Sequence, residues 1–127
     1  MGMMEQGLLR GMASMAGGIA YSGGACGALT GAIVLLGSLL GKDDPEKKDD
    51  PNLQKACSEF YKRFQDEVMA EWGSVNCRDI TGVDWKDPVQ MKAFRREGGR
   101  LRCANSTGKT ARILGEILEK YLGDKAF

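Results

Sequence analysis

Residues 11–41 carry no charged side chain, in a chain in which 28% of the residues are Asp, Glu, Lys or Arg. The most apolar part of this stretch runs from Cys26 to Leu40. A segment that is apolar on every side is typical of a helix enclosed by other helices. It is shorter than the roughly 20 residues that a membrane-spanning helix needs. We therefore expect a buried central helix, with a membrane-associated helix as the alternative.

The segments after this stretch predict further helices. Residues 42–51 form a charged linker with two prolines, and residues 52–72 form an amphipathic helix. One face of that helix carries the residues that recur at helical spacing, namely Cys57, Phe60, Tyr61, Phe64 and Val68. A short helix is expected to begin at Cys77, capped by Asn76.

Two more helices are expected near the C-terminus, over Val89–Arg96 and from Asn105 to Leu122, with Asn105-Ser106-Thr107 as the N-cap cluster of the last one. No segment alternates between apolar and polar residues with period two, so no sheet is expected. The sequence thus predicts an all-α bundle of four to five helices. Residues 1–127 would form one domain that contains the charged linker.

Histidine is absent from the chain, which excludes catalysis by His-containing triads and metal sites with His ligands. The chain has 18 basic and 17 acidic residues, a balance that argues against binding nucleic acid. Gly108-Lys109-Thr110 matches the end of a phosphate-binding loop, but Cys103 occupies the place of the glycine that the full pattern needs. We therefore expect neither nucleic acid nor a nucleotide as a ligand.

Chemistry must then come from the cysteines, and three of them share a setting. Cys26 follows a Gly-rich segment and precedes the central helix, while Cys77 is followed by Arg78. Cys103 follows Arg102 and lies just before the expected last helix. Helix N-termini and neighbouring cations stabilise a thiolate. We predict that these three cysteines form one reactive cluster.

Cys57 differs from the other cysteines because it lies in the middle of an amphipathic helix, on its aromatic face. A buried cysteine in such a place usually acts as a small apolar side chain. We expect Cys57 to be structural. In the alternative of a metal site, it would be a fourth ligand beside Cys26, Cys77 and Cys103.

The pattern Cys26-Gly27-Ala28-Leu29-Thr30-Gly31, with Asn76-Cys77-Arg78 and a late Cys103, resembles the C_GCAxxG_C_C proteins of bacteria and archaea. These proteins are described as redox-active. The resemblance spans most of residues 7–122 and implies that these three cysteines are the second, third and fourth of the family signature. It also implies a first cysteine further upstream. None precedes Cys26 here, so we expect a shortened member or a chain whose N-terminal part is missing.

Three functions stay open. The first is a thiol redox protein, and thus a thiol–disulfide oxidoreductase, in which two of Cys26, Cys77 and Cys103 alternate between dithiol and disulfide. The second is a protein that binds a metal ion or an iron–sulfur cluster through cysteine thiolates. The third is a non-catalytic helical module that docks on a transporter or a partner enzyme.

The remaining expectations concern partners and location. The partner would be a redox protein or a transporter. The Met-rich segment 1–15 favours a homodimer, because methionine suits adaptable apolar contacts. The N-terminus does not read as a signal peptide, so a reducing cytoplasm is expected.

Overall fold

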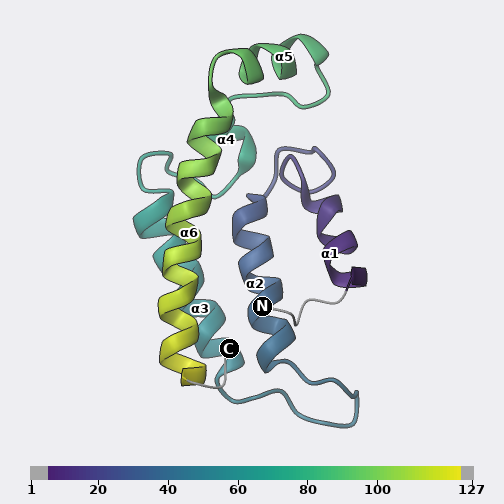
Figure 1. Ribbon diagram of the computed structural model, residues 1–127, viewed down its shortest axis with the longest axis vertical. Coiled ribbons are helices and arrows are strands. Elements are labelled where there is room, and N and C mark those ends of the chain that lie inside the picture. Colours follow the sequence, from purple (N-terminus) through teal and green to yellow (C-terminus); the bar gives the residue numbers. More distant parts are fainter. Residues whose placement is uncertain (1–5, 124–127) are drawn as a thin grey trace.

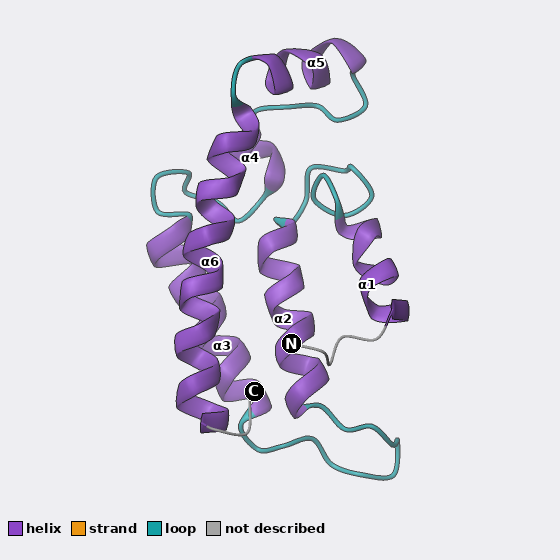
Figure 2. Ribbon diagram, in the orientation of Figure 1, coloured by secondary structure: helices purple, strands orange, loops and turns teal. Residues whose placement is uncertain are grey.

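The computed structural model describes residues 6–123, and within them every regular element is helical. The prediction of an all-α protein is therefore confirmed. The helices are α1 (Gln6–Met12), α2 (Gly27–Leu40), α3 (Leu53–Arg63), α4 (Cys77–Thr81), α5 (Pro88–Arg96) and α6 (Gly99–Leu122). A 3₁₀ turn (η1, Ala13–Met15) extends α1, and a π-helical turn (η2, Phe64–Val68) extends α3. Figures 1 and 2 show that α2, α3 and α6 run side by side, with α5 beyond one end of the bundle.

The core lies where α2, α3 and α6 meet. Fully buried side chains come from each of them, including Leu36, Phe60, Phe64 and Ile113. Burying a side chain of this size stabilises the fold by about 1.5–3 kcal/mol. The apolar stretch therefore provides a core helix, with Leu29, Ala32, Leu35, Leu36 and Leu40 facing the core. It is not enclosed on every side as predicted, because Thr30, Ile33 and Val34 are only partly buried and line an apolar pocket. In the view of Figure 1, α2 lies between α6 and α1.

The helix expected over residues 52–72 is shorter than predicted. Regular α-helix ends at Arg63, and the π-helical turn carries the chain only to Val68. The Met69 amide donates to the Phe64 carbonyl, which is the i→i+5 bond of a π-helix. The extra residue in this turn lets Val68 and Met69, which are adjacent in sequence, both be buried. Packing against the core thus overrides the regular 3.6-residue repeat.

The last helix begins earlier than predicted, at Gly99 instead of Asn105. The break before it is Gly98, which adopts a left-handed conformation (φ 79°) that only glycine takes readily. The expected N-cap cluster lies inside the helix. Its Thr107 hydroxyl donates to the Cys103 carbonyl one turn back, at 2.8 Å. Because Ser and Thr satisfy their hydroxyls in this way within helices, their presence did not mark a helix start.

Among residues 6–123, no helix is both long enough and apolar enough to cross a membrane. The Met-rich segment on which the homodimer prediction depends lies partly outside the described residues. Its described part forms α1, which was not predicted, and η1. The Leu9 side chain on α1 is 63% exposed.

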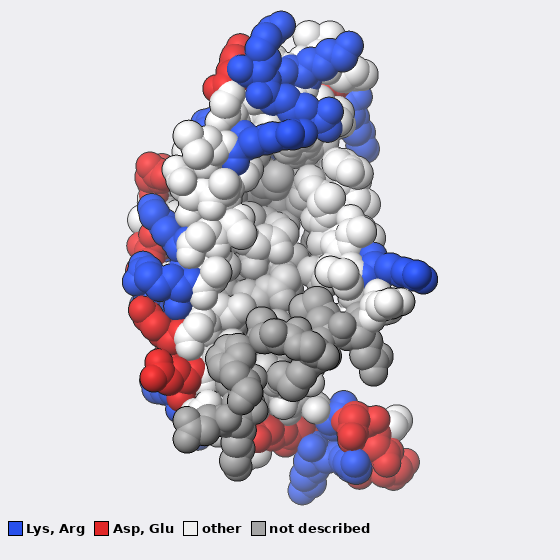
Figure 3. All heavy atoms as spheres, in the orientation of Figure 1, with Lys and Arg blue, Asp and Glu red and all other residues white. Residues whose placement is uncertain are grey.

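Charged side chains lie at both ends of the molecule and along one long side. Figure 3 shows Lys and Arg side chains over α5 and the start of α6. The linker 42–51 at the other end carries the ion pair Lys47–Asp43, at 2.8 Å between Nζ and Oδ1.

Candidate thiol site

A single antiparallel bridge brings two of the predicted cysteines to the same place. Ala25 pairs with Asn76, and each is followed directly by a cysteine. The Cys26 amide donates to the Val75 carbonyl at 2.9 Å, and the Cys77 amide donates to the Gly24 carbonyl at 2.6 Å. Residues related in this way are diagonal neighbours on the same face of a paired segment. The bridge thus joins the starts of α2 and α4.

The segment before Cys26 forms a left-handed turn over this bridge. Gly17 to Tyr21 have φ values between 51° and 74°, which side chains other than that of glycine rarely adopt. The Gly23 and Gly24 amides close the turn by donating to the Gly17 and Gly18 carbonyls, at 2.9 and 2.8 Å. Gly18 is buried, and a Cβ atom placed there would lie 2.7 Å from the Cβ of Cys77.

The Arg78 side chain binds this segment to the start of α4. Its Nε donates to the Gly23 carbonyl at 3.1 Å, and its backbone amide donates to the same oxygen, also at 3.1 Å. The guanidinium that was expected to act on Cys77 as a neighbouring cation therefore also has a structural contact. The backbone segments that carry Cys26 and Cys77 are therefore held together by backbone hydrogen bonds and by the Arg78 side chain.

Cys26 occupies the N-cap position of α2. Burial raises the pKa of its thiol, and the nearby backbone amides of Ala28 and Leu29 lower that pKa in part. The negative charge of Cys77 raises it further. The expectation that the helix start would favour a Cys26 thiolate is therefore wrong in sign, because the loss of solvation outweighs the helix amides.

Cys77 is the first residue of α4 and lies next to Trp85. The indole Nε1 of Trp85 donates to the Cys77 Sγ at 3.3 Å. Trp85 in turn packs edge-on against the ring of Phe94, with centroids 5.3 Å apart. This contact was not predictable from the sequence, because Trp85 lies in an irregular loop and residue spacing does not identify which group an indole N–H contacts.

Cys103 lies in the second turn of α6, not before it, so its predicted place at a helix start is wrong. Burial raises the pKa of its thiol, the charges of Cys77 and Cys26 raise it further, and Arg102 lowers it. The Arg102 guanidinium lies over the Trp72 ring, 5.9 Å from its centroid.

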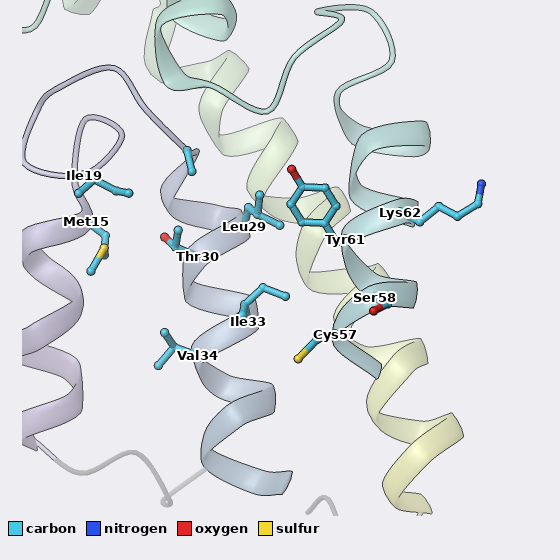
Figure 4. Close-up of a pocket in the computed structure, with 11 residues that line it drawn as sticks. Met15, Ile19, Leu29, Thr30, Ile33, Val34, Cys57, Ser58, Tyr61 and Lys62 are labelled. Carbon is cyan, nitrogen blue, oxygen red and sulfur yellow. The ribbon is translucent and has the colours of Figure 1, made fainter. Parts of the chain in front are cut away.

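Cys57 lies apart, on α3, in the wall of an apolar pocket of about 720 Å³. Figure 4 shows its sulfur directed toward α2, across the pocket from Ile33. The pocket also includes Met15 and Ile19 from the N-terminal segment. Burial raises the pKa of Cys57, without a contribution from another cysteine.

All four cysteines are free thiols. In the part of the chain that the structure describes, no three Cys, Asp or Glu side chains are grouped so that they could hold a metal ion. The alternative ligand set of Cys26, Cys57, Cys77 and Cys103 thus does not fit a bound metal or cluster in this arrangement.

Comparison with protein families bears on the same cysteines. Residues 1–117 match the family model described as "Putative redox-active protein (C_GCAxxG_C_C)". The chain belongs to this family. The match to the C_GCAxxG_C_C family covers the left-handed turn, the bridge and the cysteine-bearing part of α6. No curated protein and no solved structure matches the chain significantly.

Proposed function

We propose that this member of the C_GCAxxG_C_C family is a thiol–disulfide redox protein that exchanges electrons with a disulfide of a partner. Cys26 and Cys77 would be the principal pair, with Cys103 as a third thiol beside them. The observation that supports this most is the bridge between Ala25 and Asn76, because it holds two signature cysteines as diagonal neighbours. The redox description of the family agrees with it.

The proposed exchange is balanced. Two protein thiols lose two protons and two electrons and form one disulfide, while the partner disulfide takes them up and becomes two thiols. Bond formation requires the two Cα atoms to come within roughly 4.4–6.8 Å of each other. A cytoplasmic location and a homodimer remain predictions from the sequence.

The test is to incubate the reduced protein with a small disulfide, then block free thiols and map disulfides in non-reduced digests. We expect a loss of two thiols and an intrachain disulfide that includes Cys77. Cys77→Ser should abolish that loss with nearly unchanged helical content. Cys57→Ser is the matched control and should behave like the unmodified protein. A Cys77→Ser protein that loses two thiols at the unmodified rate would refute the proposal.

The apolar pocket beside Cys57 favours a second candidate, the helical docking module. The pocket lies between the N-terminal segment, α2 and α3, and a partner bound there would contact a surface that has no role in disulfide exchange. Thiols at Cys26, Cys77 and Cys103 that stay inert to small disulfides would favour this function over the first.

A further inference from the structure

We propose that Trp85 is the positioning residue that makes Cys77 the attacking thiol, with a disulfide as the substrate. The inference rests on the proposed redox function and assigns roles within it. The decisive contact is the hydrogen bond of 3.3 Å from the Trp85 Nε1 to the Cys77 Sγ.

The indole N–H donates only, so the sulfur must accept. A negatively charged acceptor forms a stronger hydrogen bond than a neutral one, and a thiolate therefore gains more from this contact than a thiol does. In the described residues, Cys77 is the one cysteine whose sulfur accepts a hydrogen bond from another side chain. Trp85 thus distinguishes Cys77 from Cys26 and Cys103.

The loop that carries Trp85 is held in place at both ends. Thr81 donates to the Cys77 carbonyl at 2.8 Å and accepts from the Val83 amide at 3.2 Å. Further along, the Asp84 amide donates to the Gln90 side chain at 2.9 Å. The Trp85 ring itself rests edge-on against Phe94, which is buried. The indole N–H is therefore directed at the sulfur by a fixed frame that begins on α4, the helix of Cys77 itself.

The other two cysteines are suited to the opposite role. Burial raises the pKa of Cys26 and of Cys103, and the charge of Cys77 raises both further. Both thiols therefore ionise less readily next to a charged Cys77. Once the Cys77 sulfur is bonded to another sulfur, that charge is gone and one cause of their raised pKa disappears, while burial, the larger cause, remains.

The sequence of steps follows. The Cys77 thiolate attacks one sulfur of the substrate disulfide, the substrate S–S bond breaks, and the leaving thiolate takes a proton from water. Cys26 then loses its proton to water and attacks the Cys77 sulfur. The mixed disulfide breaks and the second substrate thiol is released. The protein ends with a Cys26–Cys77 disulfide and the substrate with two thiols.

The test compares Trp85→Phe with Trp72→Phe. Phenylalanine keeps an aromatic ring against Phe94 but removes the N–H. Trp72 is the matched control because its Nε1 is buried without a hydrogen-bond partner among the described residues. The measurement is the rate at which iodoacetamide alkylates Cys77 in the fully reduced protein, followed by mass spectrometry from pH 5 to pH 10.

We expect the midpoint of the Cys77 pH profile to rise by about one pH unit in Trp85→Phe, which is a tenfold lower rate below both midpoints. The profile of Trp72→Phe should match that of the unmodified protein. A change of overall accessibility would alter the plateau rate and leave the midpoint in place. An unchanged midpoint in a folded Trp85→Phe protein overturns the assignment of Trp85.

A second measurement tests the same contact without the Trp85→Phe variant, in case that variant does not fold. In Trp72→Phe, the remaining indole fluorescence comes from Trp85 and should change at the pH at which Cys77 alkylation reaches its midpoint. Adding Cys77→Ser should remove that change, and a change that persists overturns the contact. The two proposals fail separately. Loss of disulfide formation in Cys77→Ser with no effect of Trp85→Phe would leave the redox function standing without this role.

Discussion

Replacing Gly18 by alanine, which adds only a methyl group, should destabilise the protein. The φ of Gly18 is 74°, and a Cβ atom there would lie 2.6 Å from the Gly24 amide nitrogen and 2.7 Å from the Cys77 Cβ. The left-handed conformation costs an alanine about 1–2 kcal/mol. Forcing a methyl group into a packed site typically costs a further 1–3 kcal/mol. We therefore expect Gly18→Ala to lower the free energy of unfolding by about 2–5 kcal/mol.

Urea unfolding followed by circular dichroism measures this difference. Gly108→Ala is the control, because Gly108 is exposed inside α6 and a Cβ atom there meets nothing within 4 Å. Replacing a helical glycine by alanine should raise the stability by about 0.5–1 kcal/mol, so the two variants should differ in sign. A Gly18→Ala protein as stable as the unmodified one would refute the left-handed turn and its close packing on Cys77.

Three further predictions concern the helical frame. Phe64→Ala should lower the free energy of unfolding by about 3–5 kcal/mol in the same urea assay, because the ring is fully buried. Asp87→Ala should cost about 1 kcal/mol in thermal unfolding, since the Asp87 carboxylate accepts from the Val89 amide at the start of α5. Arg63 lowers the pKa of Glu67 from its ordinary 4.5, so this pair stabilises the fold above pH 4.5 and that contribution is lost as the pH falls through the lowered value. Arg63→Gln should therefore reduce the loss of unfolding free energy between neutral and acidic pH. An unchanged pH dependence of stability on the acidic side would contradict the pairing.

The central helix was predictable because its signal is strong. An apolar run followed by a charged linker predicts a helix and its end, and α2 ends at Leu40 as expected. The uncharged character of residues 11–41 did not predict burial over the whole stretch, since Ile19 and Tyr21 are exposed. The amphipathic helix after the linker was predicted in type but not in length. Its last turn depends on how Val68 and Met69 pack, and that packing is a property of the whole core.

The cysteine setting was predictable only in part. Sequence position placed Cys26 and Cys77 at helix starts, which is correct, but it gave no measure of burial. Burial decides the direction of the pKa shift at Cys26 and at Cys103. The position of Cys103 was wrong because Gly98, and not the later polar cluster, sets the start of α6. The role of Trp85 depends on a contact across a loop, for which local sequence carries no signal.

The bridge between Ala25 and Asn76 also determines what a disulfide at this place would do to the folding of the chain. A bond between Cys26 and Cys77 would enclose residues 27–76, and thus all of α2 and α3, in one covalent ring. Closing a loop of roughly 50 residues reduces the entropy of the unfolded chain by an amount worth about 4 kcal/mol. Oxidation would therefore stabilise the folded bundle core against unfolding. Oxidation and folding form a thermodynamic cycle, so folding of the core would make the disulfide harder to reduce by the same free energy. The redox state of the chain and its folded state would then be coupled.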